Sequence, residues 1–174
     1  MIETIAEWAL TAPDEAQIAR LITLCFGDDF DNRSYYHQRP HLRLIYRQDG
    51  QIIGHIALLL RAVRLGAQMT DTIGLAEVCT HPDQRGTGVA SQLLQAAIAE
   101  ARASQAAYLT LFGTARLYAG HGFSRQSNLL TFVAMTNNRT TQITTEVAET
   151  LMVLPLRDQI WPASAPLDML GPLF

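Results

Sequence analysis

Several features are missing from this 174-residue chain, and each absence excludes a class of protein. No apolar run approaches the ~18–20 residues that a membrane-spanning helix needs. The first residues, Met1-Ile2-Glu3-Thr4, lack the basic segment that opens a secretory signal peptide. The formal net charge is −3, whereas nucleic-acid-binding domains carry a surplus of positive charge. We therefore expect a cytoplasmic protein that binds neither membranes nor nucleic acid.

Cysteine is scarce as well, with only Cys25 and Cys79 in the chain. They form no CxxC pair and no cysteine–histidine spacing of the kind that holds a metal. Both lie among apolar neighbours, which favours two buried thiols. The sequence therefore predicts no metal site.

What the chain does contain is typical of a packed globule, because 48% of its residues are hydrophobic and 17% are charged. Its length suits one domain, and we see neither an internal repeat nor a linker. We expect a single domain over residues 1–174. The proline-rich residues 155–174 read as an irregular tail laid over the surface.

The pattern of apolar and turn residues predicts a mixed α/β fold. Thr11 and Asp14 have the spacing of a helix cap, and Gly27 ends the helix that follows. Asp49-Gly50 is a strong signal for a tight hairpin turn. The other expected helices span residues 86–103 and 114–120, and the expected strands span residues 42–47, 51–60, 69–80, 107–112, 129–135 and 149–156. The strand–helix–strand unit around residues 69–112 implies a parallel pair.

The most informative stretch runs from Cys79 to Ala90 and joins a strand to a helix through a short glycine-bearing turn. Such a junction aims unpaired backbone N–H groups and the positive end of a helix dipole at one point. Gly86 and Gly88 let a ligand approach the backbone closely. We expect a phosphate or pyrophosphate to bind there.

Two familiar phosphate-binding motifs do not fit this turn. A P-loop needs a Gly-Lys pair, which the chain lacks. A dinucleotide fingerprint needs a glycine or alanine where Ser91 stands, and an acidic residue where Gly113 and Thr114 follow the next strand.

A third pattern, Arg/Gln-x-x-Gly-x-Gly/Ala, is met by residues 85–90. This segment resembles the acyl-coenzyme A motif of the GNAT superfamily of N-acyltransferases. Downstream, Tyr118 precedes the pair Gly122-Phe123 by four residues on a short predicted helix, which is similar to the second signature of that superfamily. The resemblance covers residues ~73–135. It implies a single-domain GNAT fold, in which a mostly antiparallel mixed sheet is flanked by helices and a splayed parallel strand pair lies at the coenzyme A site.

Two narrower resemblances extend beyond these motifs. Segments 44–46, 52–55, 115–119 and 153–155 resemble aminoglycoside 2-prime N-acetyltransferases. The tail, with Leu154-Pro155, Trp161-Pro162 and Gly171-Pro172, resembles the nodulation N-acyltransferase family. Neither resemblance carries a substrate across.

The GNAT resemblance implies acetyl-CoA as the acyl donor, with no metal. The backbone of the turn would hold the pyrophosphate, and the pantetheine arm would lie beside the end of the preceding strand. The cofactor-binding residues are then Val78, Cys79, Thr80, Arg85, Gly86, Thr87, Gly88, Val89 and Ala90.

The same resemblance suggests two catalytic residues. Tyr118 is the candidate general acid for the departing thiolate, and the alternative is a tyrosine that anchors its helix. Glu77 is the candidate base for the amine, and the equally weighted alternative is a solvent-facing strand residue. Direct attack by the amine is preferred to an acyl-enzyme on Cys79. His81 and His121 are read as structural.

The acceptor is the least determined partner. The loop after the first helix carries Asp28, Asp29, Asp31, Tyr35 and Tyr36, which suit a cationic amine, although a solvated loop is the simpler interpretation. We expect a small-molecule amine, and the sequence leaves a homodimer open. The leading hypothesis is an N-acetyltransferase acting on a primary amine. The alternatives are a longer-chain N-acyltransferase and a catalytically silent acyl-CoA-binding domain.

Overall fold

The structure, a computed structural model, describes residues 1–114 and 116–174. The chain divides into two compact units. The first contains residues 1–59 and 75–100, and the second contains residues 60–74 and 101–174. Two long strands, β3 (Gln51–Leu65) and β4 (Gln68–Thr80), contribute residues to both units.

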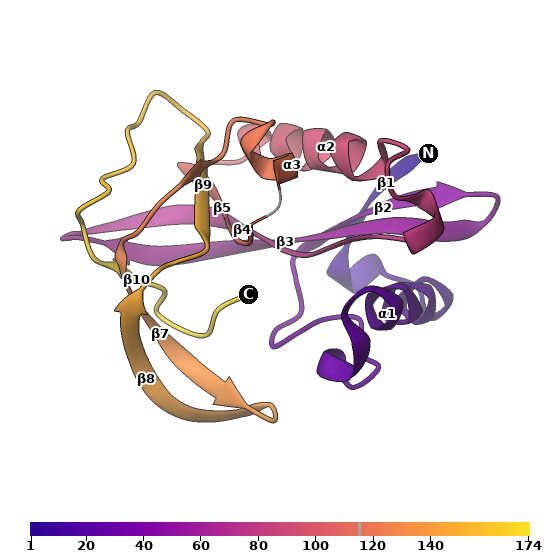
Figure 1. The fold of residues 1–174 in the computed structure, drawn as a ribbon, viewed down its shortest axis with the longest axis horizontal. Coiled ribbons are helices and arrows are strands. Elements are labelled where there is room, and N and C mark those ends of the chain that lie inside the picture. Colours follow the sequence, from indigo (N-terminus) through magenta and orange to yellow (C-terminus); the bar gives the residue numbers. More distant parts are fainter. Residues whose placement is uncertain (115) are drawn as a thin grey trace. The chain divides into compact units, whose positions relative to one another are not determined.

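The first unit is a small antiparallel sheet with a helix on each face (Figure 1). Its strand β1 pairs with β2, and β2 pairs with β3 in an antiparallel hairpin. Besides its parts of β3 and β4, its elements are β1 (Ile2–Ala6), η1 (Glu7–Ala9), α1 (Ala12–Phe26), η2 (Gly27–Phe30), β2 (Leu42–Gln48), η3 (Pro82–Gln84) and α2 (Val89–Ala103).

Helix α1 begins and ends where the sequence predicts. The Thr11 hydroxyl caps it by accepting a hydrogen bond from the Asp14 N–H at 3.3 Å. Gly27 ends it with φ 74, in the region that glycine adopts readily. The buried face of the helix packs into a core with β2 and β3, through Ile18, Leu21 and Ile22.

The β2–β3 hairpin sets the position of α2. Asp49 and Gly50 both have positive φ, at 50 and 79, as a two-residue hairpin turn requires. Gly54 on β3 lies beneath the helix, because a Cβ added there would be 2.7 Å from side-chain atoms of Val89 and Leu93. The absence of a side chain at Gly54 therefore lets α2 pack directly on the sheet.

The second unit has a mixed sheet with the strand order β6-β9-β5-β4-β3-β10-β7-β8. Strand β5 pairs antiparallel with β9, and β10 pairs parallel with β7. The mixed α/β fold expected from the sequence is therefore confirmed. The further elements are β5 (Tyr108–Phe112), α3 (Arg116–Ala119), β6 (Ser124–Arg125), β7 (Leu129–Thr136), β8 (Arg139–Val147), β9 (Leu151–Pro155) and β10 (Leu167–Asp168).

The predicted surface tail is wrong in part. Within residues 155–174, Trp161 is 7% exposed, and Leu167 and Met169 are each 2% exposed. The Trp161 indole donates a hydrogen bond to Asn128 Oδ1 at 2.8 Å, and β10 adds a short strand between β3 and β7. A two-residue strand between prolines has no periodicity, so the sequence carries no signal for it.

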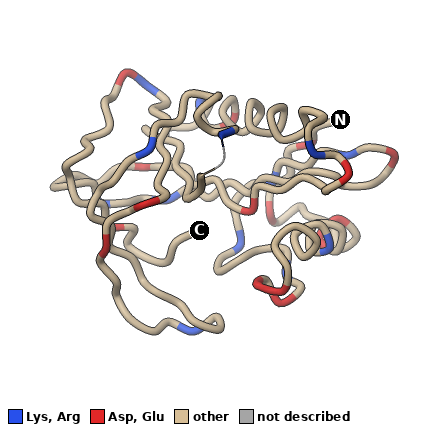
Figure 2. Tube along the Cα trace, viewed as in Figure 1, with Lys and Arg blue, Asp and Glu red and all other residues tan. Residues whose placement is uncertain are grey.

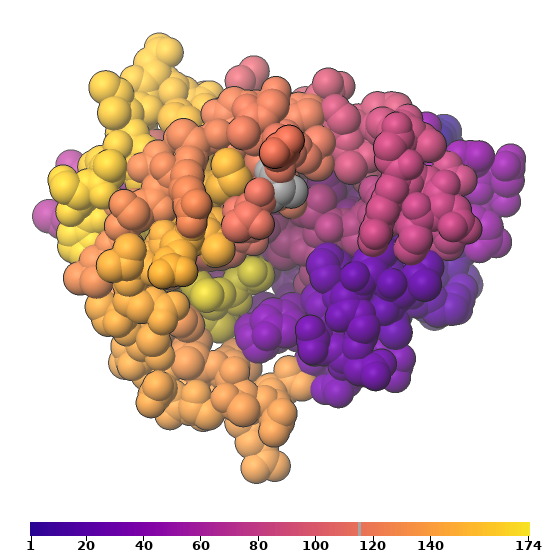
Figure 3. Space-filling view, in the orientation of Figure 1, coloured from indigo at the N-terminus to yellow at the C-terminus, as the bar shows by residue number. Residues whose placement is uncertain are grey.

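Two strands and the bounds of two helices also differ from expectation. Strand β1 and the exposed strand β8, which projects with β7 from the second unit in Figure 3, are absent from the sequence prediction. Helix α2 begins at Val89 rather than at residue 86, because residues 85–88 form the turn. In the short predicted helix 114–120, Ala115 lies outside the described residues, and α3 covers Arg116–Ala119.

Candidate functional site

The glycine turn between β4 and α2 is open to a ligand. Gly86 and Gly88 have φ values of 77 and 89, and a Cβ added at Gly86 would meet nothing within 4 Å. The Thr87 hydroxyl braces the turn by donating to the Gln84 carbonyl at 2.7 Å. Helix α2 starts immediately afterwards, so its N-terminal N–H groups follow the turn directly. An open turn of this kind at a helix N-terminus is compatible with an anion, and pyrophosphate binding there stays a prediction.

The strand that leads into this turn is interrupted at Glu77. This residue has φ 52, although it lies within β4. Left-handed backbone is uncommon for a residue that carries a side chain, and it marks a local break in the strand. The predicted cofactor-binding residues Val78, Cys79 and Thr80 follow that break directly, and the Thr80 hydroxyl is buried with no hydrogen-bond partner among the described residues.

The Glu77 carboxylate is buried rather than solvent-facing. Its Oε1 accepts a hydrogen bond from the Tyr36 N–H at 2.8 Å, and its Oε2 is buried with no partner in the described part of the chain. Burial raises the pKa of Glu77 to about 7, although the Tyr36 hydrogen bond and the charge of Arg43 oppose this shift. The side chain as a whole keeps intermediate exposure, and the carboxyl has the pKa of a base that works near neutral pH.

Arg43 on β2 and His55 on β3 form a cluster with Glu77. The sequence analysis gave neither residue a role. Both residues are fully buried. The His55 Nδ1 lies 3.1 Å from the Glu77 carbonyl oxygen, and its Nε2 lies 3.2 Å from Arg43 Nη1. An arginine in the middle of an apolar predicted strand is the signal that could have found this cluster, because a buried guanidinium needs partners.

The two cysteines differ in environment. Cys79 is buried, as expected, whereas Cys25 is only half-buried, and its Sγ lies 3.4 Å from the Thr80 carbonyl oxygen. A hydrogen bond from Cys79, together with the nearby Arg85 guanidinium, lowers the pKa of Cys25 to about 6. The same contact and burial raise the pKa of Cys79 well above its ordinary value. Cys79 is therefore a protonated, weakly nucleophilic thiol.

The loop after α1 carries exposed acidic residues and a series of aromatic rings in contact with one another. Figure 2 shows the acidic residues gathered at η2, beyond the end of α1, and Asp28, Asp29 and Asp31 are exposed there. The Phe30 ring lies 5.3 Å from that of Tyr36, which in turn lies 3.8 Å from the His37 ring. Since the Tyr36 N–H binds Glu77, the loop and the carboxylate belong to the same part of the first unit.

Tyr118 belongs to the second unit, where α3 presents it. The side chain is buried, its ring contacts that of Phe123 edge-on at 6.0 Å, and a Cβ added at Gly113 would lie 3.3 Å from it. Burial raises the pKa of Tyr118 further above 10, so the hydroxyl stays protonated. None of the described residues hydrogen-bonds that hydroxyl. It therefore has a proton to donate and, in residues 1–114 and 116–174, no hydrogen-bond acceptor.

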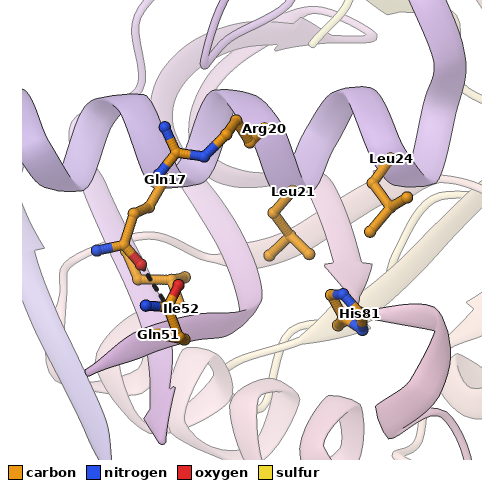
Figure 4. Close-up of a pocket in the computed structure, with 7 residues that line it drawn as sticks. All are labelled: Gln17, Arg20, Leu21, Leu24, Gln51, Ile52 and His81. Carbon is orange, nitrogen blue, oxygen red and sulfur yellow. Dashed lines mark hydrogen bonds between the residues drawn. The ribbon is translucent and has the colours of Figure 1, made fainter. Parts of the chain in front are cut away.

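The two histidines read as structural from the sequence, His81 and His121, do have structural contacts. His81 Nδ1 accepts from the Asp83 N–H at 3.3 Å and caps η3, and His121 Nδ1 lies 2.9 Å from the Leu117 carbonyl oxygen. Figure 4 shows Leu21 and Leu24 of α1 pointing toward His81 across a cavity of about 180 Å³. His81 Nδ1 also lies 3.9 Å from the exposed Asp83 carboxylate.

Residues 1–114 and 116–174 hold no cluster of metal-ligating side chains. They also contain no helix long and apolar enough to cross a membrane.

Comparison with known proteins gives one family. The acetyltransferase (GNAT) domain model matches residues 9–125, which is more than half of the chain. No curated protein matches the chain.

Several solved structures have a similar fold, each at 18% sequence identity. One is a GNAT family acetyltransferase from Brucella melitensis in complex with acetyl-CoA, with a TM-score of 0.61 and 95% of each chain covered. Another is the GNAT family N-acetyltransferase YhbS from Escherichia coli in complex with CoA, with a TM-score of 0.66 over 97% of this chain and 88% of that one. An acyl-CoA N-acyltransferase from Pseudomonas aeruginosa has a TM-score of 0.58 over 88% of this chain and 97% of that one.

The lowered pKa of Cys25 predicts selective alkylation. Because the thiolate dominates above pH 6, iodoacetamide should label Cys25 at a rate that rises around pH 6 and is flat above pH 7, while Cys79 stays unlabelled. Peptide mass spectrometry at a series of pH values measures this. In Arg85→Gln the midpoint should move upward. A wild-type rate that still climbs through pH 8.5 would contradict the assignment.

Proposed function

Because the chain belongs to the acetyltransferase (GNAT) domain family, we propose that it transfers an acetyl group from acetyl-CoA to a primary amine by direct attack in a ternary complex. The observation that carries this proposal is the Glu77 carboxylate, which is buried at a pKa of about 7 on the strand that leads into the open glycine turn. A carboxylate of this kind suits the deprotonation of an ammonium group near neutral pH.

The donor is held by the turn and by the strand before it. Backbone N–H groups of residues 85–90 bind the pyrophosphate at the N-terminus of α2, and Arg85 adds positive charge. Val78, Cys79 and Thr80 run beside the pantetheine arm. Family membership and the bound acetyl-CoA and CoA of the structurally similar enzymes support this assignment.

Glu77 serves as the base. The carboxylate takes the proton that the acceptor ammonium loses, directly or through one water, and the neutral amine then attacks the thioester carbonyl carbon. Bound acyl-CoA supplies that carbonyl and a thiolate leaving group. A backbone N–H of Val78 or Cys79 donates to the carbonyl oxygen as it gains negative charge.

Tyr118 completes the proton balance. As the carbon–sulfur bond breaks, its hydroxyl gives a proton to the departing thiolate, so free thiol is the product. The second proton, which the attacking nitrogen loses as the amide forms, returns through solvent to the Tyr118 phenolate. Its protonated, unpartnered hydroxyl supports this role. Glu77 and Tyr118 belong to different units, and each role is tested by its own variant.

The acceptor is a small-molecule amine whose positive charge is attracted by Asp28, Asp29 and Asp31. We place the reaction in the cytoplasm, where Cys25 and Cys79 persist as free thiols. Residues 1–174 act as one domain in this proposal, because β3 and β4 each run through both units.

Acetyl-CoA should stabilise the folded protein. At ~100 times its dissociation constant the gain is about 2.7 kcal/mol, visible as a rise in the melting temperature. NAD and ATP serve as comparison ligands, and Gly88→Ala, which places a side chain at φ 89, should lose most of the shift while staying folded. If acetyl-CoA does not raise the melting temperature, the donor assignment is wrong.

A screen of amines, with release of free thiol as the readout, identifies the acceptor class. Repeating the screen with longer acyl-CoA donors identifies the acyl length.

Glu77→Gln should lower turnover by about 10²–10⁴-fold, because the amide cannot accept a proton. In the wild-type protein the pKa of Glu77 is raised to about 7, so the base form is present above pH 7 and activity falls as pH drops through 7. Initial rates from pH 5.5 to 9 measure both effects. The control is Glu146→Gln on exposed β8, which should change nothing. If Glu77→Gln still loses activity as the pH falls through 7, that loss belongs to another titrating group.

Tyr118→Phe should reduce turnover by about 10²-fold or more with little change in acyl-CoA affinity, because only the proton donor is removed. The matched control is Tyr108→Phe, a second buried tyrosine whose hydroxyl donates to the Ile160 carbonyl at 3.2 Å. That variant should lose about 1 kcal/mol of stability and keep its turnover. Full activity of Tyr118→Phe would remove the general-acid role.

A further inference from the structure

Glu77 needs support from its surroundings to keep its conformation. Its φ of 52 lies in the left-handed region, which a residue with a side chain occupies only when neighbouring contacts hold it there. One of its carboxylate oxygens is also buried without a partner. A free strand would relax by turning this carboxylate toward water, so some other group keeps it inside.

Two hydrogen bonds reach Glu77 from other elements. The Tyr36 N–H binds the carboxylate at 2.8 Å, and His55 Nδ1 lies 3.1 Å from the main-chain carbonyl oxygen. The carbonyl oxygen only accepts, so Nδ1 must carry the proton that makes this bond. His55 therefore fixes the peptide unit at which the strand is broken.

Arg43 decides which nitrogen of His55 holds that proton. Its Nη1 lies 3.2 Å from His55 Nε2, and a guanidinium only donates. Nε2 must then offer a lone pair, which leaves the single proton of the neutral ring on Nδ1. Burial first, and then the charge of Arg43, lower the pKa of His55 to about 3, so the ring stays neutral at working pH.

Arg43 is itself locked in place. The Glu7 carboxylate accepts from its Nε at 2.6 Å and from its Nη2 at 3.0 Å, while the Ser34 carbonyl accepts from Nη1 at 2.6 Å. Ser34 precedes Tyr36 in the same loop. Arg43 therefore supports both routes to Glu77, one through His55 and the other through the loop that carries the Tyr36 N–H.

We propose that Glu7, Arg43 and His55 are positioning residues, whose buried hydrogen-bonded chain fixes the broken strand at Glu77 and so holds its carboxylate in the acceptor site. This inference rests on the role proposed above for Glu77. The charged and titratable groups that face the carboxylate are Arg43 from β2, Glu7 from η1 and Cys79 on its own strand, while His55 from β3 is neutral.

Two matched substitutions at His55 separate position from bulk. In His55→Asn the amide nitrogen takes the place of Nδ1 and still donates to the Glu77 carbonyl. In His55→Gln the amide lies near Nε2, so the contact with Arg43 stays and the bond to Glu77 is lost. The first measurement is the Glu77 carboxyl titration by ¹³C NMR, assigned by its absence in Glu77→Gln. The second is kcat as a function of pH.

The expected result is asymmetric. In His55→Asn, the Glu77 pKa and the acidic limb of kcat should stay near 7. In His55→Gln, both should move down by about one unit or more toward the ordinary value, and kcat should fall about 10–100-fold with acyl-CoA affinity nearly unchanged. Identical titration of both variants and wild type, or equal losses in both, would overturn the proposal.

A measurement on the unaltered chain guards against a variant that fails to fold. The ¹⁵N chemical shifts of the His55 ring should show that Nδ1 is protonated and Nε2 is unprotonated from pH 5 to 9. A proton on Nε2, or ring protonation near pH 6.5, would overturn the proposal. If the NMR results are as expected while Glu77→Gln keeps full turnover, the positioning chain stands and the catalytic role of Glu77 fails.

Discussion

The buried ion pair between Arg43 and Glu7 is the interaction on which the first unit depends. The guanidinium has no exposed surface, so its charge is tolerated only because the carboxylate, a main-chain carbonyl and an imidazole nitrogen accept its hydrogen bonds. Removing one partner of such a pair costs about 3–5 kcal/mol. The pair joins η1, the loop at Ser34, β2 and β3, and these elements surround Glu77.

The end of β4 and the short helix η3 separate Glu77 from the glycine turn, and the two places have different environments. At Glu77 the strand is broken and the carboxyl is kept from water, which raises its pKa to about 7. At Gly86 and Gly88 the backbone itself is exposed, just before the start of α2. One segment of chain thereby carries both the proposed base and the proposed anion site for acyl transfer to an amine.

Local chemistry made much of this fold predictable. The cap at Thr11, the Asp49-Gly50 turn and the apolar face of α2 each act within a few residues, so the sequence indicates them directly. Strand β8 was missed because most of its residues are polar and exposed, so its sequence shows no regular alternation of apolar and polar residues. The turn before it was the available signal, since Asn137 and Asn138 both have positive φ. The buried tail was missed because Trp161 and Met169 owe their burial to distant strands.

The sequence by itself determined the family, the glycine turn and two candidate catalytic residues, because the family motifs depend on short-range spacing of glycine, arginine and tyrosine. Only the tertiary structure decided where the Glu77 carboxylate lies and which groups surround it. Alternation along a strand assigns it to the solvent face, whereas a positive φ and contacts from Tyr36 and His55 turn it inward. Side-chain pKa depends on burial and on charges brought from elsewhere in the chain, and no local pattern of residues encodes either.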